Sequence, residues 1–338
     1  MTPDPIHSAD PAPSTGLSQR VLVLGATGTV GRAAVRALAR DGHEAVRLVR
    51  PGTPTADNSV RSIVGDVTDP ASIRHAFGLD GAPPQRLDAV VSCLTSRTGA
   101  PADAWAIDHR AHSHALLAAR DAGVRHFVLV SAICVQRPRL AFQHAKLAFE
   151  AELTASTLDW TIVRPTALMK SLSGQVGRVR AGKPFLVFGD GRLTATKPIA
   201  DDDLGRFVAG CLADPARRNR VLPIGGPGPA LPPIEMGRML HEALGRTPRF
   251  RRVPTAPFLA VARALAVPGR AVPRLAAAAE FARIAHYYAT ESMLVLDPAT
   301  GCYDADATPE TGATTLRDHY AALAAGEATN ERGDHAMF

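Results

Sequence analysis

The sequence predicts an α/β protein with a doubly wound, mostly parallel sheet and a smaller, mostly helical lobe toward the C-terminus. Two observations carry this prediction. From residue 20 to about residue 165, short apolar runs of strand length alternate with amphipathic segments of helix length, a pattern that requires right-handed crossovers between parallel strands. Beyond residue 165 the alternation loosens, and alanine-rich helical segments become prominent.

The first strand is predicted at residues 20–24, and the helix after it spans residues 30–38 and ends near Gly42. Its apolar residues recur at positions i, i+3, i+4, i+7 and i+8, which form one face of a helix. Asp69 followed by Pro70 predicts the start of another helix, because aspartate caps helix N-termini and proline favours the first turn. The remaining elements of this half are strands at 45–49, 62–64, 89–92, 126–131 and 160–163, and helices at 103–122 and 141–155.

The C-terminal half is predicted to complete the sheet and to form the smaller lobe. Helices are expected after the aspartates at 201–203, at 234–244, and over 255–288 with breaks at Pro268 and Pro273. Strands are expected at 185–188, 221–224 and 249–253. The predicted organisation is a disordered tail at 1–19, a dinucleotide-binding core at 20–165, sheet completion plus a substrate lobe at 166–325, and a second tail at 326–338.

Composition excludes several classes of protein. Of the 338 residues, 46% are hydrophobic and 21% are charged, which is typical of globular proteins and excludes fibrous and fully disordered chains. The net charge of +6 comes from scattered arginines, so we expect an anionic ligand or membrane surface rather than nucleic acid. The four cysteines lie far apart, and the histidines at 109, 112 and 114 lack acidic or cysteine partners, so no metal site is predicted.

The N-terminal segment lacks the basic start and apolar run of a signal peptide. The most apolar region, residues 258–285, is interrupted by arginine and proline, so it is not expected to span a bilayer. A cytoplasmic location is therefore expected.

A glycine-rich turn follows the first strand and opens the first helix. The glycines of Gly25-x-x-Gly28-x-x-Gly31 allow a tight turn, close approach of a pyrophosphate, and close packing of helix on strand, as in a Rossmann dinucleotide site. The helix N-terminus attracts the phosphates. The residues predicted to bind the cofactor here are Gly25, Thr27, Gly28, Thr29, Val30 and Gly31.

The residue after the second strand favours NADPH over NADH. NAD sites place an acidic residue near this point to hold the ribose 2′-hydroxyl, but the sequence has Arg50, which suits a 2′-phosphate. Arg32 is a second candidate cation. Asp66 and Val67, after the third strand, are predicted to lie near the adenine.

Further motifs resemble the extended and atypical short-chain dehydrogenase/reductases of the NmrA-like type. These are GATGTVG at 25–31, GDVTD at 65–69, HFVLVS ending at Ser131, Lys146, RPT at 164–166 and PIADDDL at 198–204. The resemblance implies that Ser131, Lys146, Pro165 and Thr166 lie at the cofactor, with Lys146 holding the nicotinamide ribose. The superfamily normally has a tyrosine four residues before the lysine, whereas this chain has Phe142.

Phe142 cannot exchange a proton, so the chain lacks the general acid that ordinary carbonyl reduction requires at this position. Two interpretations follow. Either the protein is a non-catalytic NADP-binding sensor or assembly subunit, or it transfers hydride to a carbon–carbon double bond, where no alkoxide needs protonation.

Three segments favour the second interpretation, hydride transfer to a carbon–carbon double bond. They are residues 165–176, 182–191 and especially 287–316. They resemble the NADPH-dependent divinyl chlorophyllide 8-vinyl-reductases of chlorophyll and bacteriochlorophyll synthesis. This resemblance implies reduction of a C8 vinyl group to ethyl in a divinyl chlorophyllide or protochlorophyllide, whose macrocycle can spread the negative charge. Another NADPH-dependent reduction of a double bond remains an alternative.

A chlorophyllide is a broad apolar disc that carries a propionate. Phe142, Tyr287 and Tyr288 are predicted to contact the disc, and Lys170 to meet the carboxylate, with Arg178 and Arg180 as alternatives. His144 is a candidate proton donor, although two residues is the wrong spacing for sharing a helix face with Lys146. Such a substrate favours peripheral contact with photosynthetic membranes, but no amphipathic anchor stands out in the sequence.

Overall fold

A computed structural model describes residues 18–53, 60–81 and 86–327. The two predicted tails lie almost entirely outside these residues. Within them, the main sheet has seven strands, all parallel, in the order β3-β2-β1-β4-β5-β6-β8. The strands are β1 (Arg20–Leu24), β2 (Glu44–Val49), β3 (Arg61–Val64), β4 (Ala89–Ser92), β5 (His126–Val130), β6 (Asp159–Pro165) and β8 (Arg220–Ile224).

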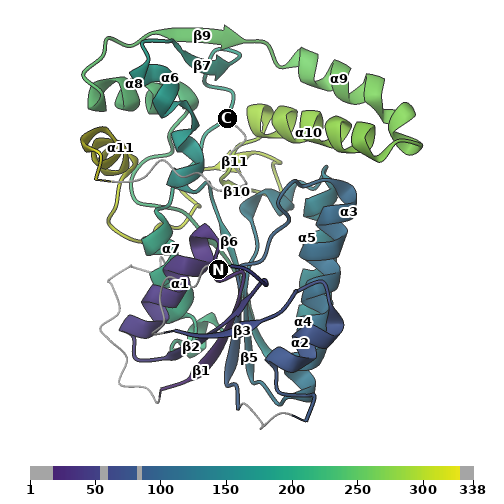
Figure 1. Cartoon of the computed structure of the whole chain (residues 1–338). Helices are drawn as coiled ribbons and strands as arrows, with labels where there is room; N and C mark the ends of the chain where they lie inside the picture. The colour runs from purple at the N-terminus through teal and green to yellow at the C-terminus, as the bar shows by residue number, and fades with distance from the viewer. Residues whose placement is uncertain (1–17, 54–59, 82–85, 328–338) are drawn as a thin grey trace.

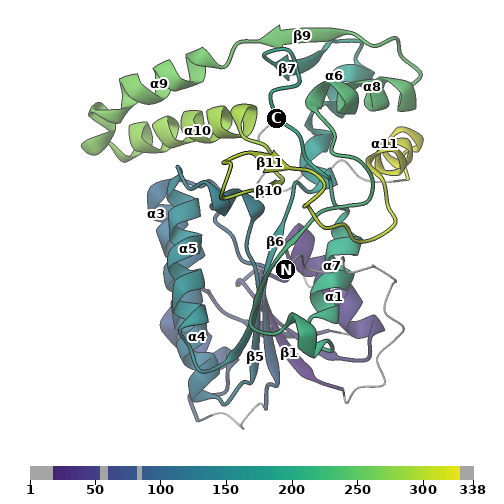
Figure 2. The same ribbon diagram turned by 180° about the vertical axis from the view of Figure 1, so that it is seen from behind.

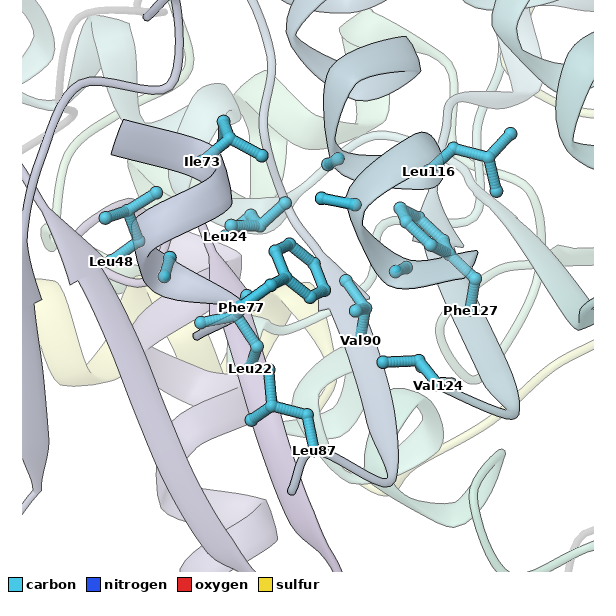
Figure 3. Close-up of a cluster of buried hydrophobic side chains, with 14 of the residues drawn as sticks. Leu22, Leu24, Leu48, Ile73, Phe77, Leu87, Val90, Leu116, Val124 and Phe127 are labelled. Atoms are coloured by element: carbon cyan, nitrogen blue, oxygen red, sulfur yellow. The ribbon is translucent and has the colours of Figure 1, made fainter. Parts of the chain in front are cut away.

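Successive side chains of a strand point to opposite faces of the sheet, and β1 is buried on both. Leu22 and Leu24 pack into the cluster shown in Figure 3, which also contains Phe77 and Phe127. Val21 and Val23 pack into a second cluster on the other face. This double burial explains why the strand reads as an uninterrupted apolar run.

Helices cover both faces of the sheet, as Figures 1 and 2 show from opposite sides. The prediction of a doubly wound parallel α/β fold is therefore confirmed. One face carries α1 (Thr29–Arg40) and α7 (Asp201–Gly210). The other carries α2 (Pro70–Ala76), α3 (Pro101–Ala104), η1 (Trp105–Ala111), α4 (His112–Asp121) and α5 (Ala141–Thr154).

The helix predicted at 103–122 differs from an ordinary α-helix. It runs continuously through α3, η1 and α4, but its seven central residues, η1, are π-helical. A π-helical turn holds more residues than an α-helical turn, so it changes which side chains of the helix point toward the protein interior. Such turns are frequent at functional sites.

The C-terminal lobe lies over the carboxyl ends of the strands (Figure 1). The predicted strands at 185–188 and 249–253 pair with each other in a separate parallel sheet, and the strand at 221–224 extends the main sheet as β8. Two long helices form a hairpin at the top of the lobe. The elements of the lobe are η3 (Met169–Gln175), α6 (Val176–Arg180), β7 (Phe185–Phe188), α8 (Pro233–Ala243), β9 (Phe250–Val253), α9 (Ala256–Ala266), η5 (Pro268–Arg270), α10 (Pro273–Thr290), β10 (Val295–Leu296), β11 (Tyr303–Asp304) and α11 (Leu316–Ala325). The short η4 (Pro215–Arg217) joins α7 to β8 at the amino ends of the strands.

Among the described residues, no helix combines the length and the apolar character that crossing a membrane requires.

Candidate functional site

The glycine-rich turn joins β1 to α1 with no room for side chains at two positions. Gly25 has φ +73°, and a Cβ there would lie 2.8 Å from the Cys93 carbonyl. A Cβ on Gly31 would lie 2.1 Å from the Gly25 carbonyl oxygen. Gly28, the N-cap of α1, donates its N–H to the Gly25 carbonyl at 3.0 Å. The turn is therefore closed by its own backbone, which leaves its outer side to Thr27 and Gly28, both exposed.

The N-terminus of α1 fits an anionic group. Gly28 supplies no side-chain cap, and the first turn of α1 contains no acidic residue. Thr29 and Val30 are half-buried at this end, and exposed Arg32 is fixed beside it because its Nη1 donates to the Thr27 carbonyl at 2.5 Å. Uncapped N–H groups, a helix dipole and a cation favour the diphosphate of a dinucleotide.

The residues predicted to lie near the adenosine follow β2 and β3. Arg50 directly follows β2 and is exposed. Asp66 follows β3, and its Oδ1 accepts hydrogen bonds from the N–H and hydroxyl of Thr68, each at 2.8 Å. Asp66 therefore shapes the turn in which Val67 lies half-buried.

Lys146 lies on α5 and forms a buried ion pair. Its Nζ is 2.9 Å from Oδ1 of Asp108, and the side chains of the two are 7% and 0% exposed. Asp108 lies in the π-helical turn η1 and also receives the N–H of Ser96 at 3.3 Å. The ammonium is therefore held at one place, near the carboxyl end of β4.

A neutral histidine completes this polar group. His112 shares a 2.8 Å hydrogen bond between its Nε2 and the Ser92 hydroxyl, and its Nδ1 lies 2.9 Å from the Ile107 carbonyl. Burial, with a smaller contribution from Lys146, lowers the pKa of His112 to about 4. We call this group the polar wall: Ser92, Ser96, Asp108, His112 and Lys146.

Ser131, at the end of β5, is buried, and its hydroxyl donates to Glu150. Glu150 lies one turn after Lys146 on α5 and also pairs with Arg164 of β6. Pro165 ends β6, and the buried Thr166 donates its hydroxyl to the Lys197 carbonyl. The serine and threonine predicted at the cofactor thus lie at the carboxyl ends of neighbouring strands and already have partners.

Phe142 lies one turn before Lys146 on the same stripe of α5, in apolar surroundings. It is 9% exposed and belongs to a buried cluster that α10 completes. A Cβ on Gly99 would lie 2.8 Å from Ile284 and 3.7 Å from Phe142, so the loop after β4 packs closely here. We call this group the apolar wall: Ile133, Cys134, Phe142, Ile284, Tyr287 and Tyr288.

The two tyrosines of the apolar wall differ in their hydrogen bonds. The Tyr287 hydroxyl donates to the carbonyls of Cys134 and Arg137, at 2.8 and 3.1 Å. The Tyr288 hydroxyl lies 4.0 Å from the Cys134 sulfur. Burial raises the pKa of both phenols above their usual range, so both stay neutral at physiological pH. The structure thus brings Phe142, Tyr287 and Tyr288 together, as predicted for substrate contacts.

The other two predicted residues lie apart from this group. His144 is exposed on α5, whereas Lys146 is buried, so the two share no face; the proton-donor role of His144 stays a prediction. Lys170 lies in η3, where its charge is close to Asp201 and His319. Burial raises the pKa of Asp201, whose Oδ1 has no hydrogen-bond partner among the described residues.

Sequence reasoning missed three acidic residues that hold the site together. Besides Asp108, these are Glu280 and Glu291 of the C-terminal lobe. Glu280 accepts the N–H of Ala141, the first residue of α5, at 2.7 Å. Glu291, buried at the end of α10, pairs with Arg137 at 3.1 Å and Arg139 at 2.8 Å. No local motif marks these contacts, since each joins segments more than 35 residues apart in the chain.

Comparisons with known proteins identify the family and the fold of the chain. A family model described as NAD(P)H-binding matches residues 25–215. The chain is 45% identical to the chloroplastic divinyl chlorophyllide a 8-vinyl-reductase of Oryza sativa subsp. indica, over 99% of this chain and 84% of that protein. It is also 45% identical to the Zea mays protein of the same name, over 99% and 87%.

Among solved structures, an NADPH-dependent quinone oxidoreductase of Escherichia coli in complex with NADPH superimposes with a TM-score of 0.65. The two sequences are 18% identical, and the match covers 90% of this chain and 99% of that one. This similarity shows a shared fold.

Proposed function

Because the chain belongs to the divinyl chlorophyllide a 8-vinyl-reductase family, we infer that it reduces the C8 vinyl group of a divinyl chlorophyllide to an ethyl group with NADPH. It is thus an NADPH-dependent oxidoreductase that acts on a carbon–carbon double bond in the synthesis of chlorophyll or bacteriochlorophyll. The observation that carries this function beyond sequence similarity is the buried stripe of α5, which keeps the cation Lys146 but has Phe142 one turn away.

When bound, NADPH supplies the hydride. We propose that the turn from Gly25 to Gly31 and the N-terminus of α1 hold its diphosphate, and that Arg32 and Arg50 neutralise the 2′-phosphate. Asp66 and Val67 would border the adenine. Ser131, Pro165 and Thr166 would line the nicotinamide end through their positions at the carboxyl ends of β5 and β6.

Lys146 has two roles in this proposal: its ammonium holds the nicotinamide ribose, and its positive charge favours the developing negative charge nearby. Asp108 acts through Lys146 as a positioning residue. A buried lysine without a partner would tend to lose its proton, and the carboxylate 2.9 Å away favours the charged form. Because His112 stays neutral, it adds no second positive charge.

The apolar wall is proposed to receive the macrocycle. Phe142 and Tyr288 offer ring surface against a flat apolar ligand, and the packed side chains exclude water. A carbonyl substrate would leave an alkoxide that requires an acid, and Phe142 cannot provide one. A vinyl group conjugated to the macrocycle needs no acid at this position because the macrocycle spreads the charge, and the proton that completes the ethyl group is added afterwards, with His144 as its predicted donor. We further propose that Lys170, half-buried in η3, meets the propionate.

We also propose a cytoplasmic location with peripheral contact to photosynthetic membranes. The relatives compared above are named as chloroplastic reductases of a chlorophyllide, and the described helices include no membrane span. An enzyme whose substrate is an apolar disc gains access to it at a lipid surface.

The direct test is to incubate the purified chain with NADPH and divinyl chlorophyllide and to follow the blue absorption band of the pigment. We expect one NADPH to be consumed for each vinyl group reduced, without added metal, ferredoxin or thiol. Tight NADPH binding without pigment reduction would instead indicate the non-catalytic sensor or assembly subunit.

A further inference from the structure

The hairpin of α9 and α10 presents an apolar surface that the rest of the described chain leaves uncovered. Ala262 of α9 is buried against α10, together with Ala279 and Ala282. The opposite side of α9 consists of alanine, proline and valine with one arginine, Arg263, and Val261 and Val267 are 48% and 68% exposed. Val272, before α10, is 42% exposed. We call this the hairpin surface: Val261, Val267 and Val272 with the arginines 251, 252, 263 and 274.

The same region has an extreme charge. From residue 243 to residue 279 the sequence contains seven arginines and no aspartate or glutamate. This local excess of seven positive charges exceeds the net charge of the whole chain, +6, so the expectation that the excess arginines are scattered evenly is wrong. The first acidic residue that follows, Glu280, is buried and occupied by the N-terminus of α5 and by Arg283.

The arginines of the hairpin surface have no acidic partner. Arg251, Arg252, Arg263 and Arg274 are exposed, and none pairs with a carboxylate within residues 18–53, 60–81 and 86–327. Several exposed arginines of other helices do have such a partner: Arg36 with Asp202, Arg74 with Asp121, Arg238 with Glu235 and Arg317 with Glu242. Exposed valines flanked by unpaired arginines are characteristic of a helix that lies in an anionic lipid interface.

We propose that the hairpin surface docks on a bilayer that carries anionic headgroups, with the valines entering the headgroup boundary and the arginines contacting phosphates. This surface would make the contact in the peripheral membrane association proposed above, and the inference rests on that association. The eleven residues of α9 extend about 16 Å, short of the ~30 Å hydrocarbon core, so the helix lies along the surface.

Two features disfavour another protein as the occupant. A second copy would bring the same acid-free, arginine-rich segment against its own, with strong like-charge repulsion. The exposed side of α9 is also rich in alanine, which is depleted in the cores of protein interfaces, where aromatic residues, methionine and arginine are enriched. Attachment is firm, because Phe258 at the base of α9 packs edge-to-face on Phe188 of β7 at 5.6 Å.

The test is co-sedimentation of the full chain with vesicles of phosphatidylcholine and phosphatidylglycerol in equal parts, beside vesicles of phosphatidylcholine alone. We expect binding to the anionic vesicles that weakens as salt is added. Val261→Asp with Val267→Asp should lower the binding constant at least about tenfold, because each change removes apolar contact and adds repulsion. Arg263→Gln with Arg274→Gln should lower it by roughly fivefold per arginine.

Matched controls remove equivalent groups elsewhere. Leu117→Asp changes an apolar side chain on α4 that is 49% exposed, and Arg120→Gln with Arg238→Gln removes two exposed charges. These variants should bind vesicles as the unchanged chain does. All variants should reduce pigment in vesicle-free solution at the unchanged rate, which separates this inference from the proposed reaction.

Three outcomes overturn the inference. If the hairpin variants and the control variants lost vesicle binding equally, the membrane contact would lie elsewhere on the protein, and peripheral association would still hold. Failure of the unchanged chain to bind anionic vesicles would remove both the contact and the association, but not vinyl reduction measured in solution. A dimer in sedimentation equilibrium that the valine variants dissociate would identify the surface as an interface between copies.

Discussion

The two ends of the buried stripe of α5 are built from opposite chemistry. At one end, Phe142 packs among carbon atoms of the apolar wall; one turn later, Lys146 enters the polar wall and pairs with Asp108. The polar end fixes a charge by hydrogen bonds and an ion pair, whereas the apolar end offers shape and excludes water. In the proposed function, one helix would thereby separate the cofactor, which needs a cation, from a vinyl carbon conjugated to a macrocycle, which needs none.

Removing the cation should have the largest effect. Lys146→Ala should lower turnover roughly 10–1000-fold, because a positioning contact and a charge are lost. It should also destabilise the fold by about 3–5 kcal/mol, since Asp108 is left as an unpaired buried charge. Lys146→Ala with Asp108→Ala should recover part of that stability in urea unfolding without recovering turnover. Recovery of turnover in the double variant would show that the lysine is only structural.

The second effect concerns the far end of the cofactor. Arg50→Asp should weaken NADPH binding by a few kcal/mol, because a contact with the 2′-phosphate becomes a repulsion. NADH binding, measured by the same calorimetric titration, should change much less. An equal loss for both cofactors would contradict the assignment of Arg50.

The polar wall should also make stability depend on pH. Burial lowers the pKa of His112 to about 4, below its value near 6.5 in the unfolded chain, so the unfolded state binds the proton first. The stabilisation that His112 contributes by staying neutral is fully present above pH 6.5 and is lost as the pH falls toward 4. Between pH 7 and pH 5 we expect the free energy of unfolding to fall by about 2 kcal/mol for this group.

His126, at the amino end of β5, serves as the control for that measurement. Its pKa is also lowered to about 4, mainly by burial, so protonation of His126 should lower the free energy of unfolding between pH 7 and pH 5 by a similar amount. Urea titrations of His126→Gln at pH 7 and pH 5 should therefore show a pH dependence smaller by about 2 kcal/mol, with the contributions of His112 and of the lowered pKa values of His43 and His319 remaining. If none remained, His112 would not be held neutral in the polar wall.

The smallest effect is expected at the apolar end. If the macrocycle holds the charge, Phe142→Tyr should leave vinyl reduction within about threefold and should create no alcohol dehydrogenase activity. Both are measured spectrophotometrically with NADPH or NADP. Strong carbonyl reduction by this variant, with no vinyl reduction by either protein, would identify a degenerate carbonyl enzyme.

Local signals made the sheet and the glycine-rich turn predictable. The apolar run at 20–24, the glycine spacing and the Asp69 cap, which accepts N–H groups of Ala71 and Ser72, act over a few residues. The capping box of α11, where Thr315 and Asp318 bond reciprocally, is an equally local signal that reading the sequence passed over. The segment from 287 to 316 was informative only through its resemblance to a family.

Long-range contacts made the rest unpredictable. The π-helical turn that aims Asp108 at Lys146 depends on packing against α5, and periodicity alone predicts an unbroken helix there. The arginines and valines of the hairpin surface are visible in the sequence, but their exposure depends on how α9 packs on α10. Sequence alone therefore showed no anchor where the structure exposes an apolar and basic surface.

The contact between Glu280 and the first residue of α5 constrains how the protein is made. The two residues are 139 positions apart, so α5 leaves the ribosome long before the carboxylate that caps it. At roughly 5–20 residues per second, this interval lasts on the order of ten to thirty seconds. During that time Phe142 lacks its cover from α10, and the nascent chain exposes an apolar patch. Translation speed and chaperone occupancy over residues 142–280 thus bear directly on the yield of folded enzyme.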